Sequence, residues 1–115
     1  MDRERWWRAA QDSTEVRGDQ FVDDPELKPV LDAYMGAIVS SYAARAQAFL
    51  DSADNWPRRW QQAAEMSDFR LSLTAAEADR LSAAVHELID SFEREPRKGD
   101  ESVSFQFQLF PWRTS

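Results

Sequence analysis

The side chains that could support catalysis are few. The chain of 115 residues has one histidine, His86, and no cysteine. Asp90 follows His86 by four positions, which places both on one face of a helix and would allow a His–carboxylate pair. An exposed or helix-capping histidine explains the same spacing, and we favour that interpretation. His86 therefore does not by itself indicate an active site.

Paired carboxylates are the other candidates for acid–base chemistry. The apolar pattern of the surrounding helix puts the acidic residues on its solvated side, which argues against a role as general acid or base. These residues are Asp79 with Glu87, and Glu93 with Glu95. One histidine, no cysteine and three glycines also leave no pattern for a transition-metal site or a glycine-rich phosphate loop. We expect no catalytic residues, no metal, no cofactor and no enzymatic activity.

The charge and composition of the chain restrict the classes of function that remain. The formal net charge is −7, which repels phosphate and argues against nucleic-acid binding by this chain. Apolar residues make up 43% and aromatic residues 12%, as in folded domains. The sequence contains no apolar run of about 18 residues and no secretory signal core at its start. With no cysteine, these features predict a cytoplasmic protein without a membrane segment.

Tryptophan and tyrosine are abundant for a chain of this length. Packing in the core and at interfaces accounts for most of them. The alternative is an aromatic-lined pocket for an apolar or aromatic small molecule, between the long helix and the sheet predicted below. The candidate pocket residues are Trp7, Tyr34, Tyr42, Trp56 and Trp60.

The last third of the chain is predicted to form a strand, a helix and a second strand. Apolar residues alternate with polar ones over 69–73 and again over 103–109, as in half-buried strands. Between them, Thr74 and Glu77 have the spacing of a capping box. The helix that follows carries one apolar stripe of residues three and four positions apart: Ala78, Leu81, Val85, Leu88 and Phe92.

A long amphipathic helix is predicted from about Pro25 to Asp51, with Asp23 and Asp24 at its start. It would span roughly 40 Å, more than the core of so small a domain can cover. Part of its apolar stripe is therefore expected to pack on a second copy of the chain, giving a homodimer. The candidate dimer interface consists of Leu31, Ile38, Tyr42 and Phe49. A short helix is predicted to begin at Trp56–Pro57 and continue to about Ser67.

These elements predict an α+β fold: an N-terminal strand over residues 3–10, a long helix, a short helix, and a strand–helix–strand unit on a small sheet. The tryptophans of the N-terminal strand, Trp6 and Trp7, would cover both of its faces. We divide the chain into a wing-like strand and linker at 1–22 and a helical dimerisation and effector domain with a small sheet at 23–115. An anionic partner contacting Arg3, Arg5 and Arg8 is the alternative role for the N-terminal segment.

Several of these segments together resemble the C-terminal part of bacterial ArsR-like winged-helix transcriptional regulators. The resemblance rests on Arg-Glu-Arg-Trp-Trp-Arg-Ala-Ala at 3–10, Trp56-Pro57, Leu-Ser-Leu-Thr-Ala-Ala-Glu at 71–77, and Leu109-Phe110-Pro111. It covers nearly the whole chain, but its motifs are structural and mark no ligand site. The family's helix-turn-helix would precede Met1 and is absent from this sequence, and its metal-sensing cysteines are absent too.

The resemblance implies the regulatory half of a DNA-binding transcriptional regulator. Such a domain would dimerise and could sense an apolar or aromatic small-molecule effector, while DNA would be bound only through the missing upstream domain. The alternative is a stand-alone dimeric interaction protein that binds a protein partner through the long helix, for example as an antagonist of a full-length regulator. A small enzyme is the third and weakest alternative.

Overall fold

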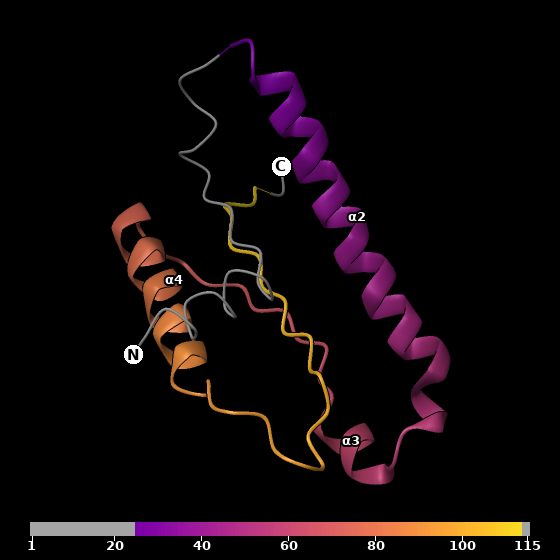
Figure 1. The fold of residues 1–115 in the computed structure, drawn as a ribbon. Helices are drawn as coiled ribbons and strands as arrows, with labels where there is room; N and C mark the ends of the chain where they lie inside the picture. The colour runs from indigo at the N-terminus through magenta and orange to yellow at the C-terminus, as the bar shows by residue number, and fades with distance from the viewer. Residues whose placement is uncertain (1–24, 114–115) are drawn as a thin grey trace. The chain divides into compact units, whose positions relative to one another are not determined.

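The computed structural model describes residues 25–113, and the chain divides into two compact units, Met1–Asn55 and Trp56–Ser115 (Figure 1). Helices account for 56% of the described residues. The boundary between the units falls after Asn55, where the long helix has ended. The boundary expected between residues 22 and 23 lies outside the described residues, as does the N-terminal strand expected over 3–10.

The first unit contains the long helix α2, Lys28–Ser52, followed by a turn of 3-10 helix, Ala53–Asn55. Its first backbone hydrogen bond runs from the Leu31 N–H to the Leu27 carbonyl at 2.9 Å, and no side chain caps the start. The helix was predicted to begin at about Pro25. Pro29 explains the later start, because proline is tolerated in the first turn but removes a hydrogen bond deeper in a helix.

The second unit begins with the short helix α3, Arg58–Ala63. Pro57 precedes it, and the Gln61 side-chain amide donates to the Trp56 carbonyl at 2.8 Å. The helix ends where Ala64 turns to an extended conformation with ψ of 145°, so the predicted continuation to Ser67 is wrong. No side chain caps the start of this helix.

Helix α4, Ala75–Asp90, begins as the sequence predicts. The Thr74 N–H donates to Glu77 Oε1 at 2.8 Å, and the Glu77 N–H donates to Thr74 Oγ1 at 3.1 Å. This reciprocal pair is the predicted capping box, and it satisfies two backbone groups at the helix start. The apolar stripe is only partly covered: Ala78, Leu81 and Val85 are half-buried, whereas Leu88 and Phe92 remain 61% and 78% exposed.

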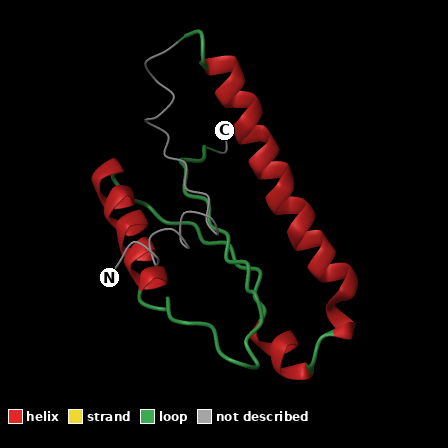
Figure 2. Cartoon of the chain, in the orientation of Figure 1, coloured by secondary structure: helices red, strands yellow, loops and turns green. Residues whose placement is uncertain are grey.

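The predicted α+β fold is wrong for the part of the chain that the structure describes. Residues 25–113 contain helices and no strand, and the segments 69–73 and 103–109 are extended but unpaired with each other as a sheet (Figure 2). The alternation of apolar and polar residues in these segments determines which side chains share a face. It does not provide a hydrogen-bonding partner for the backbone. A two-stranded sheet is marginal in water, so the pattern alone does not make one.

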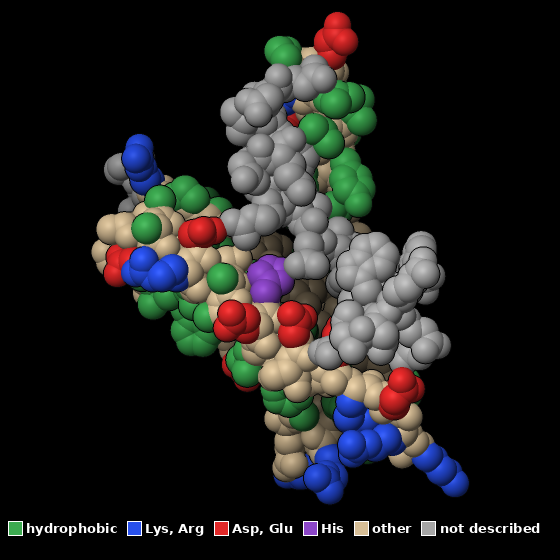
Figure 3. Space-filling model, turned by 60° about the vertical axis from the view of Figure 1, so that its left-hand side comes forward, with side chains coloured by type: hydrophobic (Ala, Val, Ile, Leu, Met, Phe, Trp, Pro, Cys, Tyr) green, Lys and Arg blue, Asp and Glu red, His purple; other side chains and the backbone are tan. Residues whose placement is uncertain are grey.

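Both extended segments consequently leave large apolar side chains in solvent. Phe69 and Leu71 are 77% and 65% exposed, and Val103 and Phe105 are 68% and 65% exposed. Hydrophobic side chains are visible at the surface of the described part in the space-filling view (Figure 3). No described residue is fully buried.

Candidate interaction surfaces

Helix α2 carries the residues predicted to form a dimer interface. Leu31, Ile38, Tyr42 and Phe49, which we call the α2 stripe, lie along one side of the helix and are all half-buried. The Arg45 guanidinium lies over the Tyr42 ring, 5.9 Å from its centroid, at a distance that permits a cation–π interaction. The α2 stripe is thus a continuous aliphatic and aromatic line with one cation beside it.

Other apolar side chains on α2 are more exposed than the α2 stripe. Val30, Val39 and Leu50 are 65%, 50% and 54% exposed, and Leu27, which immediately precedes the helix, is 51% exposed. Apolar groups therefore occur on more than one side of the helix. A helix of this kind is typically covered by neighbouring protein on several sides.

The five residues of the predicted aromatic pocket fall in different parts of the chain. Tyr34, half-exposed, and Tyr42 lie on α2 in the first unit, while Trp56 and Trp60 lie at the beginning of the second unit. Trp7 lies outside the described residues. Trp60 lines an open depression together with Pro57, Arg59 and Ala63. This surface hollow lies within the α3 segment, and Trp60 is the residue of the predicted pocket that lines it.

His86, the only histidine, contacts an aromatic ring. It lies on α4, and its ring meets the Phe107 ring edge-on, with centroids 5.5 Å apart and planes inclined by 71°. Phe107 in turn lies 6.3 Å from Phe105, centroid to centroid. Edge-to-face contacts of this kind favour association of the ring pair beyond the area that they bury. His86 therefore helps to attach the extended segment 101–113, which we call the closing segment, to α4.

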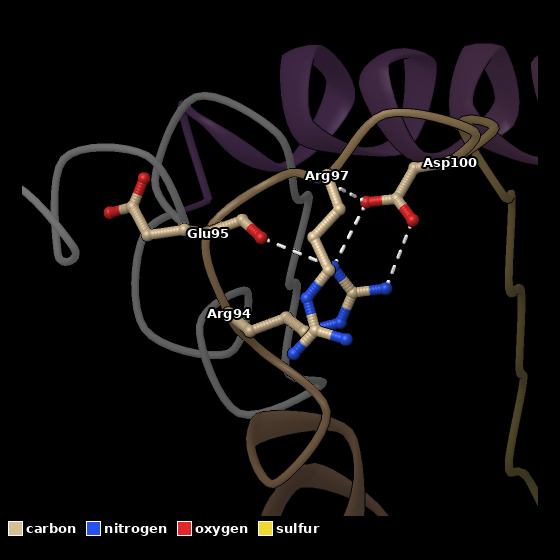
Figure 4. A network of polar contacts seen from close by, with 4 residues as sticks. All are labelled: Arg94, Glu95, Arg97 and Asp100. Carbon is tan, nitrogen blue, oxygen red and sulfur yellow. Dashed lines mark hydrogen bonds and ion pairs between the residues drawn. The ribbon is translucent and has the colours of Figure 1, made fainter.

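A polar cluster shapes the connection between α4 and the closing segment (Figure 4). The Arg94 guanidinium donates from Nη1 and Nη2 to the two carboxylate oxygens of Asp100, each at 3.0 Å. Arg94 Nη1 also donates to the Glu95 carbonyl at 3.1 Å, and the Arg97 N–H donates to Asp100 Oδ2 at 2.7 Å. Paired hydrogen bonds between guanidinium and carboxylate fix the geometry of both groups.

The backbone within this cluster forms a tight turn. The Asp100 N–H donates to the Arg97 carbonyl at 3.1 Å, and Gly99 has a φ of +95°. Glycine at the third position of a turn with positive φ is characteristic of type II. The hydrogen bonds from Arg94 and Arg97 lower the pKa of the Asp100 carboxyl from 3.8 to about 2. The sequence signal for this turn is Gly99-Asp100.

The cluster has no sign of catalytic use. Arg94 and Asp100 form an ion pair with each other. A carboxylate with a lowered pKa, such as that of Asp100, is also a poor base near neutral pH. Among residues 25–113, no three acidic or histidine side chains lie together in a way that could hold a metal ion. Over the same residues, no helix combines the length and apolar character needed to cross a membrane.

Comparison with known proteins gives no relative. No family, no curated protein and no solved structure matches the chain. The resemblance to ArsR-like regulators therefore stays a prediction. Arguments about function have to rest on the surfaces described above.

Proposed function

We propose that this chain is a non-enzymatic interaction module of the cytoplasm that forms a homodimer through helix α2. The observation that carries the proposal is the exposure of apolar side chains along α2, in addition to the half-buried α2 stripe. Removing apolar surface from water contributes about 25 cal/mol per Å². A second copy of α2 would cover these side chains without any change in the helix itself.

The spacing of the α2 stripe suits a helix pair. Leu31 and Ile38 are seven residues apart, and so are Tyr42 and Phe49. Apolar residues repeating at this interval keep one seam of a helix facing its partner, as in two-stranded coiled coils. Met35 precedes Tyr42 by the same interval and extends the seam. Arg45, beside the seam, would be a polar position that restricts the register of the two helices.

Two substitutions on α2 test this proposal. Ile38→Asp places a charge in the seam and should weaken the dimer at least tenfold, because burying an unpaired carboxylate is costly. Ser40→Asp adds the same charge two positions away, at an exposed site, and should leave dimerisation nearly unchanged. Sedimentation velocity gives the dimer fraction, and far-UV circular dichroism checks that both variants keep their helix. Equal dimer fractions for the two variants would refute the α2 interface.

The wider role that we propose is the regulatory half of a winged-helix transcriptional regulator. It is supported by the resemblance in the sequence and by the net charge of −7, which leaves DNA contact to another domain. In such a regulator the α2 pair would set the spacing of two DNA-binding domains. Sequencing the gene upstream of the Met1 codon tests this role. A reading frame that continues back through a helix-turn-helix is expected, and an in-frame stop codon immediately before Met1 would contradict it.

A further inference from the structure

The end of helix α4 presents apolar side chains to solvent (Figure 1). Leu88 is 61% exposed, Ile89 36% and Phe92 78%. Phe92 lies four positions after Leu88 and three after Ile89, so the three side chains share one side of the helical turn. We call these three residues the α4 end face. Leu81 and Val85, earlier in the same apolar stripe, are half-buried, so the stripe is most exposed at its end.

Hydrogen bonds hold the α4 end face in helical geometry past the last residue of the helix. The Ser91 N–H donates to the Glu87 carbonyl at 3.1 Å, and the Ser91 hydroxyl donates to the Leu88 carbonyl at 2.6 Å. The Phe92 N–H donates to the Ile89 carbonyl at 3.0 Å. These bonds order the backbone that carries the face. An apolar face that is ordered in advance loses little conformational entropy when a partner covers it.

Acidic side chains border the α4 end face. Glu87, Asp90 and Glu93 are exposed and interspersed with its apolar residues, and the sequence has no basic side chain between Glu87 and Glu93. The next residue, Arg94, donates two hydrogen bonds of 3.0 Å to Asp100. The carbonyl end of a helix carries partial negative charge, which acidic residues there reinforce. The surroundings of the face therefore favour a positively charged partner.

The same charge argues against several other occupants. Two copies of α4 that packed through this face would bring their carboxylates together, and like charges at the border of a contact oppose association. Anionic lipid headgroups and nucleic-acid phosphates would be repelled in the same way. Covering Leu88 and Phe92 nevertheless removes large apolar side chains from water, which favours association. The occupant that meets both conditions is apolar protein surface with cationic residues at its border.

We propose that the α4 end face docks into an apolar groove of another protein, and that Lys or Arg side chains border this groove. In this mode of recognition, an amphipathic helix inserts side chains that are three and four positions apart into an apolar groove. The acidic side chains beside the face would then lie against the basic border. The contact belongs to the second unit, so it does not rest on the proposed homodimer of α2.

A synthetic helical hairpin provides a defined probe for this surface. Leucines line the groove between its two helices, lysines border the groove, and a fluorophore reports binding of the full chain by anisotropy. Phe92→Ser should weaken binding about tenfold or more, because it removes the largest side chain of the face. Phe69→Ser is the matched control, since Phe69 is 77% exposed but lies outside α4, and should leave the affinity nearly unchanged. Far-UV circular dichroism checks that both variants keep their helices.

The charged border is tested separately by salt. Glu87→Lys should weaken binding about tenfold in low salt and far less at about 500 mM sodium chloride, where exposed charges are screened. Asp68→Lys changes the net charge equally at an exposed site outside α4 and should have little effect in either condition. Phe92→Ser should weaken binding in both conditions, because salt does not screen the burial of apolar surface. A hairpin with glutamates in place of its lysines should prefer the Glu87→Lys chain.

Other results would overturn the proposal. Equal losses in Phe92→Ser and Phe69→Ser, or in Glu87→Lys and Asp68→Lys, would indicate attraction by composition or net charge without docking on α4. Failure of the unaltered chain to bind the lysine-bordered hairpin at about 1 mM would also contradict the proposal. Neither result bears on α2, because the dimer fractions of the α2 variants judge the proposed function separately.

Discussion

The Arg94 guanidinium holds the Asp100 carboxylate through two hydrogen bonds of 3.0 Å, and this pair closes the turn between α4 and the closing segment. Both side chains stay partly exposed, at 45% and 35% of their surface. The contribution of the pair to stability is accordingly reduced by solvent screening. Its structural effect is to fix where the closing segment begins.

The turn should depend on acid pH. The pKa of Asp100 is lowered to about 2 in the folded chain, so the folded state favours the carboxylate. The stabilisation is therefore present above the ordinary pKa of 3.8, and is lost as the pH falls from about 4 to 2. An NMR titration of the Asp100 carboxyl carbon, with the Gly99 amide as reporter of the turn, measures this. Titration of Asp100 near its ordinary pKa would contradict the paired geometry.

Replacing Asp100 tests the same turn at neutral pH. Asp100→Asn removes the charge and one acceptor for Arg94, so the amide of residue 100, which donates to the Arg97 carbonyl, should exchange with solvent faster and report no transition in acid. Asp68→Asn removes an exposed carboxylate from the same unit and is the control. Identical exchange rates in the two variants would show that Asp100 does not hold the turn.

The capping box of α4 should be measurable in stability. Thr74→Ala removes the hydroxyl that accepts from the Glu77 N–H and should cost about 1 kcal/mol of helix stability. Thr74→Ser keeps the acceptor and should retain most of it. Hydrogen bonds with Thr74 lower the pKa of Glu77, so this pKa should rise toward its ordinary value in the alanine variant. Amide exchange in the first turn of α4 gives the stability, and a carboxyl titration gives the pKa.

The contact between His86 and Phe107 should appear in the NMR spectrum. Each ring of a pair whose centroids lie 5.5 Å apart experiences the ring current of the other, so Phe107→Leu should move the resonances of the His86 ring protons. Phe110→Leu removes an exposed aromatic ring from the same segment and should leave them nearly unchanged. Equal shifts in both variants would show that the closing segment does not rest on α4.

The helices were predictable where local sequence determines them. Thr74 and Glu77 form their capping box entirely within one turn, so spacing alone predicted it. The start of α2 was misplaced because Pro25 and Pro29 both fit a first turn, and only one of them can occupy it. The strands predicted over 69–73 and 103–109 from alternation are wrong, because a ladder requires a partner that periodicity does not identify.

The candidate surfaces, too, were predictable where local sequence determines them and were missed where they depend on contacts formed by the fold. The α2 stripe was predictable because Leu31, Ile38, Tyr42 and Phe49 share a face through helical periodicity alone. The bond between Arg94 and Asp100 was missed, because it depends on the turn at Gly99 that brings the two side chains together. Contact of His86 with Phe107 was missed for a related reason: it joins residues that are distant in the sequence.

The mass of the unaltered chain in solution tests the central claim most directly. Sedimentation equilibrium from low to high micromolar concentration should show a reversible dimer, with twice the chain mass of 13.3 kDa. The dimer fraction should rise with concentration, as mass action requires. A single species of 13.3 kDa at high micromolar concentration would contradict self-association through α2.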